Sequence, residues 1–228
     1  MRRQDFIFAA VVVAIFLPFF LSDGIYAWYK SFNAAHGMVM SFLKFGILAT
    51  LGEMLGGRIS TGRYLSPTFG MVPRMVVWGV LGMGINMAMI IFSKGTPLFL
   101  EYMGMESAVE SFTAEALTLD KFWVALAVSV AMNTIFAPVF MTLHKITDAH
   151  IAECGGSIRA LITPIPMGRL FGEINWQVQW GFVFKKTIPL FWYPAHTITF
   201  LLPAEWRVLF AALLGIVLGV LLVIATKR

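Results

Sequence analysis

Residues 122–143, FWVALAVSVAMNTIFAPVFMTL, contain no charged side chain over a length that can cross a membrane. A transmembrane helix needs about 20 predominantly apolar residues to span the hydrocarbon core of a bilayer. Residues 6–22, 75–93 and 208–226 are three further charge-free stretches of similar length. Together these stretches predict four membrane-spanning helices.

The composition of the whole chain agrees with this interpretation. Of its 228 residues 59% are apolar and 13% are charged, whereas about a quarter of the residues of a soluble domain are charged. This excludes a soluble globular domain and a disordered chain, and the single cysteine, Cys154, excludes an internal disulfide framework. We predict an all-α, polytopic integral membrane protein whose partner is the lipid bilayer, with residues 1–228 forming a single transmembrane helical domain.

Two weaker stretches raise the prediction to about six transmembrane helices. Residues 31–52 are apolar but carry Lys44 near their middle, and residues 187–204 lack Lys, Arg, Asp and Glu but contain three prolines. The prolines are Pro189, Pro194 and Pro203. Because proline lacks an N–H group and clashes with the preceding turn, we expect the 187–204 helix to be kinked.

The Lys and Arg residues predict the orientation of the helices. With six crossings, twelve basic residues fall on the side that carries both termini, four fall on the opposite side, and Lys44 lies within a helix. Since cytoplasmic loops are enriched in Lys and Arg, both termini are expected in the cytoplasm. The first helix is expected to stay uncleaved, because no A-x-A-like site follows it. The predicted location is a cell inner membrane, with an organelle inner membrane as the alternative. The basic residues form no stripe or reader motif, so no nucleic-acid partner is expected.

The connection 94–121 is acidic and has apolar residues at helical spacing. The apolar stripe consists of Leu98, Tyr102, Met105, Val109 and Phe112. Such spacing is typical of an amphipathic helix, so we predict a short interfacial helix that rests on the lipid headgroups. An acidic vestibule that attracts cations is the alternative.

The residues that follow position 143 include side chains of the types that bind metals. They are His144, Asp148, His150, Glu153 and Cys154. Their spacing matches no zinc signature, and a solvated cytoplasmic loop explains them equally well. We therefore predict no metal site and no cofactor.

Polar side chains within apolar helices are costly and usually face a bundle interior or a wet cavity. Four of them are predicted to line a transport path or polar core. They are Lys44, Asn86, Asn133 and His196. Glu53 and Arg74 are predicted to form an ion pair or gate on the cytoplasmic side. The alternatives are that the asparagines only join helices and that Lys44 extends outward along a lipid-facing surface.

The predicted function is a channel or transporter for small solutes of unknown identity. No Ser/His/Asp order, Cys/His pair or pair of aspartates within the spans indicates a catalytic centre, so an enzyme is not expected. Two alternatives stay open, a membrane scaffold or assembly protein that transports nothing and an intramembrane enzyme that acts on lipid. Ala211, Gly215 and Gly219 indicate close helix packing, within one chain or between the chains of a homo-oligomer.

Several short motifs follow one another along residues 45–225. They are Gly52-Glu53, Arg74 eight residues before Gly82-Met83-Gly84, Phe136-Ala137-Pro138, Asn175-Trp176, Tyr193-Pro194, Leu202-Pro203 and Arg207. In this order they resemble the Mpv/PMP family of small peroxisomal and mitochondrial inner-membrane proteins and its bacterial relatives. Met132-Asn133 stands where the family has Asp-Gln, so the chain is similar to a divergent member. The resemblance implies a multi-helix membrane fold and, as described for some members, a weakly selective channel for small metabolites.

Overall fold

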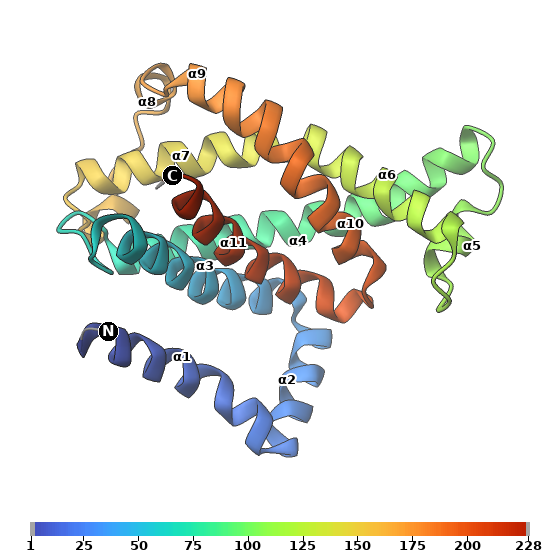
Figure 1. Ribbon diagram of the computed structural model, residues 1–228, viewed down its shortest axis with the longest axis horizontal. Coiled ribbons are helices and arrows are strands. Elements are labelled where there is room, and N and C mark those ends of the chain that lie inside the picture. Colours follow the sequence, from blue (N-terminus) through green and yellow to red (C-terminus); the bar gives the residue numbers. More distant parts are fainter. Residues whose placement is uncertain (1–2, 227–228) are drawn as a thin grey trace. The chain divides into compact units, whose positions relative to one another are not determined.

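The computed structural model describes residues 3–226, and within this range the ordered elements are helices, without a β-strand (Figure 1). The predicted all-α class is confirmed. The chain divides into two compact units, Met1–Met40 and Ser41–Arg228, where the sequence predicts a single domain. The polar and charged residues that the sequence singles out all lie in the second unit.

Three helices are long and apolar enough to cross a membrane. They are α1 (Arg3–Leu21), α3 (Gly37–Thr61) and α4 (Met71–Tyr102). A fourth candidate is the pair α6 (Leu119–Ile135) and α7 (Ala137–Glu153), which is long and apolar enough when taken together and is bent by 44°, as in a broken span or a re-entrant loop. The described residues thus contain three or four candidate spans. The predicted crossing 187–204 is not among them, and about half of the predicted crossing 208–226 lies outside the residues whose side chains are described.

The first unit contains α1 and a helix that the sequence analysis missed, α2 (Asp23–Ala35). Ser22 caps this helix, because its hydroxyl accepts a hydrogen bond of 3.3 Å from the backbone N–H three residues later, and Asp23 in the first turn favours a helix start. The predicted membrane helix 31–52 begins too early, since the chain breaks at His36 between α2 and α3. No residue of α2 is fully buried, but the helix packs on α1 through the rings of Phe19 and Tyr29, whose centroids lie 5.3 Å apart, so both capping and packing support it.

In the second unit α3 and α4 approach closely at a glycine. A Cβ atom placed on Gly82 of α4 would lie 2.4 Å from the Cβ of Phe45 on α3. This fits the predicted role of small residues, which allow two helices to approach closely. The same helix pair brings Glu53 of α3 into an ion pair with Arg74 of α4.

The connection after α4 differs from the predicted amphipathic helix. The helix α4 continues to Tyr102, the chain turns at Gly104 with a φ of 105°, and a separate short helix, α5 (Ala108–Thr113), follows. Glu101 stabilises this turn, because its Oε1 accepts a hydrogen bond of 3.0 Å from the N–H of Val109. The single helix predicted along the apolar stripe is therefore wrong in extent, since the stripe is divided between two helices.

The predicted span 122–143 is divided between α6 and α7 at Phe136. Pro138, at the start of α7, lacks the N–H that would continue the hydrogen bonds of α6, which accounts for the bend. The helix α7 then continues beyond the predicted end of the span. His144 and Asp148 therefore lie one turn apart on a helix, and not in the predicted solvated loop.

Two short helices, η1 (Ile158–Leu161) and α8 (Met167–Gly172), follow α7. Arg169 of α8 forms ion pairs with Glu153 at 2.7 Å and with Glu173 at 3.1 Å. The hydrogen bond to Glu153, and after it the one to Glu173, raises the pKa of Arg169. These contacts tie the connection to the end of α7.

The prolines of the predicted 187–204 helix coincide with a change of helix type. After the single turn α9 (Trp176–Val178), the chain forms a π-helix, η2 (Gln179–Trp192), and then an α-helix, α10 (Tyr193–Leu201). Pro189 lies within η2, and Pro194 lies in the first turn of α10, where a missing N–H is tolerated. Long π-helices are rare, and π turns often occur at functional sites.

The last helix, α11 (Ala204–Thr226), begins immediately after Pro203. Arg207 closes the end of α10, because it donates hydrogen bonds of 3.0 Å to the carbonyl oxygens of Phe200 and Leu202. The helix α10 packs against α6 and α11, and α6 packs against α4 (Figure 1). Residues of these helices, together with residues of α3, α7 and η2, line a cavity.

Candidate functional site

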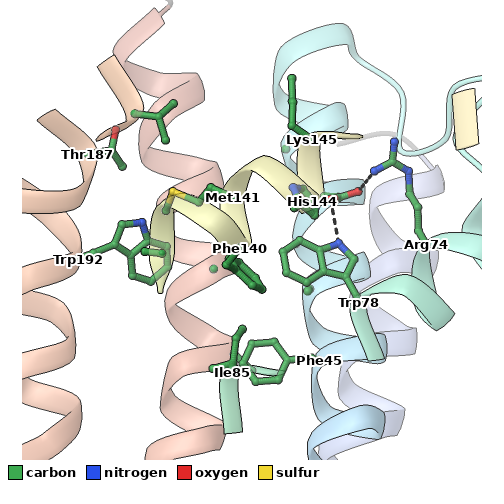
Figure 2. A pocket seen from close by; sticks show the side chains of 18 of the residues that line it. Phe45, Arg74, Trp78, Ile85, Phe140, Met141, His144, Lys145, Thr187 and Trp192 are labelled. Atoms are coloured by element: carbon green, nitrogen blue, oxygen red, sulfur yellow. Dashed lines mark hydrogen bonds and ion pairs between the residues drawn. The ribbon is translucent and has the colours of Figure 1, made fainter. Parts of the chain in front are cut away.

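The second unit contains a partly open cavity of about 710 Å³ between its helices. Side chains of α3, α4, α6, α7, η2, α10 and α11 line the cavity, and many are aromatic. The aromatic residues include Phe45, Trp78, Phe136, Phe140, Phe182 and Trp192. Figure 2 shows Phe140 between Trp78 and Trp192, which belong to different walls. Small-molecule sites typically have volumes of about 300–1,000 Å³ and mostly apolar walls with a few polar groups, so this cavity has the size and walls of such a site.

A group of charged residues, here called the Glu53 cluster, lies at the cavity and consists of Glu53, Arg74, Trp78, His144 and Asp148. The Glu53 carboxylate accepts hydrogen bonds from Arg74 Nη1, from Trp78 Nε1 at 2.9 Å and from His144 Nε2 at 3.1 Å (Figure 2). Arg74 Nη1 also donates to Asp148 Oδ1 at 2.6 Å. The cluster therefore joins α3, α4 and α7.

The charges of the Glu53 cluster offset one another in part within the protein. Its four charged or titratable side chains are between 13% and 24% exposed. Arg74 offsets one of the two carboxylates, and an imidazolium at His144 would bring the sum of formal charges to zero. Removing one partner of a buried ion pair costs about 3–5 kcal/mol, because the other charge is left without compensation. The cluster thus stabilises the contact of three helices.

Three members of the Glu53 cluster are also metal-binding types. Glu53, His144 and Asp148 each offer a ligand atom, and these atoms lie within 4.8 Å of one another. Imidazole and carboxylate suit several divalent transition metals. However, Arg74 donates to both carboxylates, and its positive charge would repel a cation placed between them. The three ligand residues fit a metal ion only if Arg74 moves away. In this arrangement the guanidinium of Arg74 supplies the positive charge that a metal ion would otherwise supply.

The other metal-binding types that follow position 143 have different partners. His150 Nε2 lies 3.1 Å from the carbonyl oxygen of Ala160, to which it donates, and Glu153 pairs with Arg169. The predicted group of His144, Asp148, His150, Glu153 and Cys154 is therefore divided. Its first two members join the Glu53 cluster, and the described residues do not bring the rest to the cavity wall.

A second polar group lies where α6 meets α10. Asn133 Nδ2 donates to the carbonyl oxygen of Ser129 at 2.8 Å, so its Oδ1 is the atom that lies 3.0 Å from His196 Nδ1. Because an amide oxygen can only accept, His196 Nδ1 carries the hydrogen. Asn133 and His196 are 2% and 7% exposed, and both belong to the cavity wall. They join two helices and also supply polar atoms to the cavity.

Three buried polar atoms have no hydrogen-bond partner among the described residues. They are Thr50 Oγ1, Gln179 Nε2 and Trp192 Nε1. Leaving a buried donor or acceptor unpaired costs about 1–3 kcal/mol. Gln179 and Trp192 belong to the cavity wall, so a molecule in the cavity can accept hydrogen bonds from them.

The four residues predicted to line a transport path separate into two pairs. Asn133 and His196 are hydrogen-bonded to each other in the cavity wall. Lys44 and Asn86 are buried, at 7% and 8% exposure, but neither lines this cavity as the structure describes it. A path through this cavity therefore does not depend on Lys44.

Sequence analysis missed Trp78, Gln179 and Trp192. Trp78 follows Arg74 by four positions, so both lie on one face of a helix, and this spacing was visible in the sequence. Gln179 lies in a segment that was predicted to be a loop, and its position at the cavity follows from the π-helix η2. No sequence pattern marks these last two residues as wall residues.

Comparison with protein-family models, curated proteins and solved structures finds no match to this chain. The resemblance to the Mpv/PMP family therefore rests on the short motifs of the sequence and stays a prediction. The cavity, the Glu53 cluster and the Asn133–His196 pair are the features from which a function is inferred.

Proposed function

We propose that this chain is a multi-pass membrane protein that forms a channel or transporter for small solutes, with the cavity of the second unit as its solute site. The observation that carries the proposal is the cavity itself, whose volume of about 710 Å³ suits a small organic molecule. Its mostly apolar wall includes polar groups on several helices, among them Glu53, Asn133, Gln179 and His196.

The proposal includes six membrane crossings with both termini in the cytoplasm. With α6 and α7 counted as one span beside α1, α3 and α4, η2 with α10 provides the fifth crossing and α11 provides the sixth. The change from π-helix to α-helix near Pro194 supports this assignment, because π-helical turns often occur at functional sites. Irregular backbone at membrane depth is tolerated where it lines a cavity.

The Glu53 cluster is proposed as the gate on the cytoplasmic side. The end of α3 and the residues directly after it, 60–66, belong to the basic side of the chain and contribute to the cavity wall. A gate needs two arrangements of the same residues, and an ion-pair cluster between three helices can exchange partners when one helix moves. Arg74 already contacts two carboxylates, Glu53 and Asp148, and is the residue through which such an exchange would occur.

The test is solute release from liposomes that contain the purified protein. Gly56 lies in the cavity wall, and a Cβ atom there would meet no other atom within 4 Å. Gly56→Trp should therefore fill the cavity and abolish release while the protein stays folded. Gly95 is the matched control, since it is a helical glycine with equally open surroundings outside the wall. The proposal would be contradicted if the unmodified protein released none of a panel of neutral, cationic and anionic solutes.

A membrane scaffold is the second candidate function, and one observation favours it. The hydrogen bonds from His196 through Asn133 to Ser129 join α10 to α6, which is what polar residues do when they only hold helices together. A scaffold should release no solute, and its bundle should lose stability on Asn133→Leu. The release assay distinguishes the two functions, because a scaffold gives the same null result for Gly56→Trp and the unmodified protein.

A further inference from the structure

We infer that the cavity binds an amphipathic anion, a small molecule with one sulfonate, carboxylate or phosphate group on an apolar and preferably aromatic body. This inference rests on the proposed function and names the class of solute. Three independent features support it: the charges of the wall, its unpaired hydrogen-bond donors and its aromatic rings.

The charges of the cavity wall favour an anion. The wall contains three permanently basic residues, Arg63, Arg74 and Lys145, and one carboxylate, that of Glu53. Glu53 is satisfied by Arg74 and by two further donors. Arg63 and Lys145 are exposed, and neither forms an ion pair within the described part of the chain. Asp148, three residues after Lys145, is held by Arg74. Glu53 and Asp148 together carry two negative charges, and Arg63, Arg74 and Lys145 carry three positive ones, so with a neutral His144 the group has a net charge of +1 that attracts a negative group.

The unpaired polar atoms of the wall are donors. Gln179 is 6% exposed, and its Nε2 and the Nε1 of Trp192 have no partner among the described residues. Both atoms carry hydrogens and can only donate. Oxygen atoms of an anion or of a carbonyl group accept such hydrogen bonds, whereas an ammonium group has no acceptor to offer.

The aromatic wall selects the rest of the molecule. Rings of Phe45, Trp78, Phe136 and Phe140 belong to the wall, and the indole of Trp192 adds a further apolar surface. A solute that is polar all round would lose its hydrogen bonds to water against these rings, which is unfavourable. An apolar ring in the same place gains the burial of its surface. The cavity therefore suits one charged end and one apolar end.

The experiment measures binding with three probes that share a naphthalene body. Isothermal titration calorimetry would use the full chain in phosphatidylcholine nanodiscs, with empty nanodiscs as the blank. The probes are naphthalene-2-sulfonate, the neutral 2-naphthalenemethanol and the cationic 2-naphthylmethylammonium. We expect the sulfonate to bind about tenfold more tightly than the ammonium, because its negative charge is complementary to the positive charge of the cavity wall. Raising the salt concentration from about 0.1 M to about 1 M shortens the Debye length from about 10 Å to about 3 Å. Of the three affinities, only that for the sulfonate should therefore become weaker.

Paired variants assign the effect to the cavity. The double variant Arg63→Gln, Lys145→Gln should lose about tenfold in sulfonate affinity and keep its affinity for the neutral alcohol, because it removes charge and leaves the aromatic wall. The control is Lys185→Gln, Lys186→Gln, which removes two exposed cations of η2 that do not line the cavity. Equal affinities for the three probes, or equal losses in the two double variants, would overturn the inference.

Two further results show whether the anion is a lipid headgroup or a soluble molecule, and whether a negative result refutes this inference or the proposed function. Phosphatidylglycerol in the nanodisc should compete with the sulfonate in the unmodified protein, and not in the Arg63, Lys145 double variant, if the anion is a lipid headgroup. An unchanged affinity instead identifies a soluble anion. Charge-independent binding together with solute release would refute this inference and leave the proposed function standing. Selective sulfonate binding without release of any solute would support the anion site and refute transport.

Discussion

Two polar regions of the cavity wall, the Glu53 cluster and the donors of η2, differ in how far the protein satisfies them. In the Glu53 cluster one carboxylate accepts three hydrogen bonds, and Arg74 spans two carboxylates. On η2 the buried nitrogen atoms of Gln179 and Trp192 have no partner in the part of the chain that is described.

This difference indicates a division of roles within one cavity. A satisfied ion-pair cluster stabilises the protein and loses much when one member is removed. An unpaired buried donor destabilises the protein until a ligand accepts a hydrogen bond from it. Removing the donor should therefore change the stability of the protein little and weaken the binding of the ligand. The four predictions that follow test this division, from the largest expected effect on stability to the smallest.

The variant Arg74→Met should cause the largest loss of stability, about 3–5 kcal/mol, because it leaves the carboxylates of Glu53 and Asp148 close together without a guanidinium. Thermal unfolding in detergent, followed by circular dichroism, measures the loss. Arg63→Met is the control, since Arg63 is an exposed wall residue without an ion pair among the described residues, and it should change stability by less than about 0.5 kcal/mol. Equal effects of the two variants would contradict the structural role of the cluster.

The variant Asn133→Leu should cost about 2 kcal/mol, because it leaves the Nδ1–H of His196 buried without an acceptor. The neighbouring Thr134→Val is the control. It removes a hydrogen bond of 2.7 Å to the Tyr193 hydroxyl at an exposed position, and should cost less than about 1 kcal/mol. The same unfolding measurement compares them. A smaller loss for Asn133→Leu than for Thr134→Val would show that the pair does not hold α6 to α10.

Zinc should stabilise the Arg74→Met variant and leave the unmodified protein unchanged. Without Arg74, the ligand atoms of Glu53, His144 and Asp148 lie within 4.8 Å of one another and are free to bind a cation. At a zinc concentration ten times the dissociation constant, the gain is about 1.4 kcal/mol. Unfolding with added zinc and with a chelator measures the gain. Stabilisation of the unmodified protein by zinc would show that Arg74 does not exclude a metal.

The variant Gln179→Leu should have the smallest effect on stability, within about 0.5 kcal/mol or slightly stabilising, because the amide that it removes has no partner among the described residues. Its effect should instead be seen in ligand binding, as a weaker affinity for naphthalene-2-sulfonate. Calorimetry and thermal unfolding of the same preparation give both values. A stability loss as large as that of Asn133→Leu would mean that Gln179 belongs to the satisfied part of the wall.

Local sequence patterns predicted several parts of this structure. The apolar stretch 75–93 lies within the helix α4, and the stretch 6–22 lies within α1 except for Ser22, which caps α2. The ion pair of Glu53 and Arg74 was predicted because the two residues lie at opposite ends of one connection between two predicted helices. These features depend on composition and on short spacings, which can be read along one helix at a time.

Other parts depended on contacts between helices that are distant in the sequence. His144 and Asp148 reach Glu53 because α7 continues past residue 143 and does not end there in a loop. No proline or glycine directly after residue 143 indicated in the sequence where this helix ends. The depth of Lys44 in an apolar stretch indicated a wet path, but burial along a helix does not tell which cavity a side chain faces. The capped helix α2 was missed because Ser22 and Asp23 were considered only as a possible cleavage site after the first apolar stretch, and not as the start of a helix.

The amino-acid sequence by itself determined the helical class and the apolar stretches of several helices, because each follows from the chemistry of neighbouring residues. Only the tertiary structure decided which polar groups meet. It joined Glu53 to Arg74, His144 and Asp148 across three helices, and it placed Gln179 and Trp192 at the cavity without a partner. A hydrogen bond or an ion pair needs two groups within a few ångströms, and the packing of helices alone sets that distance.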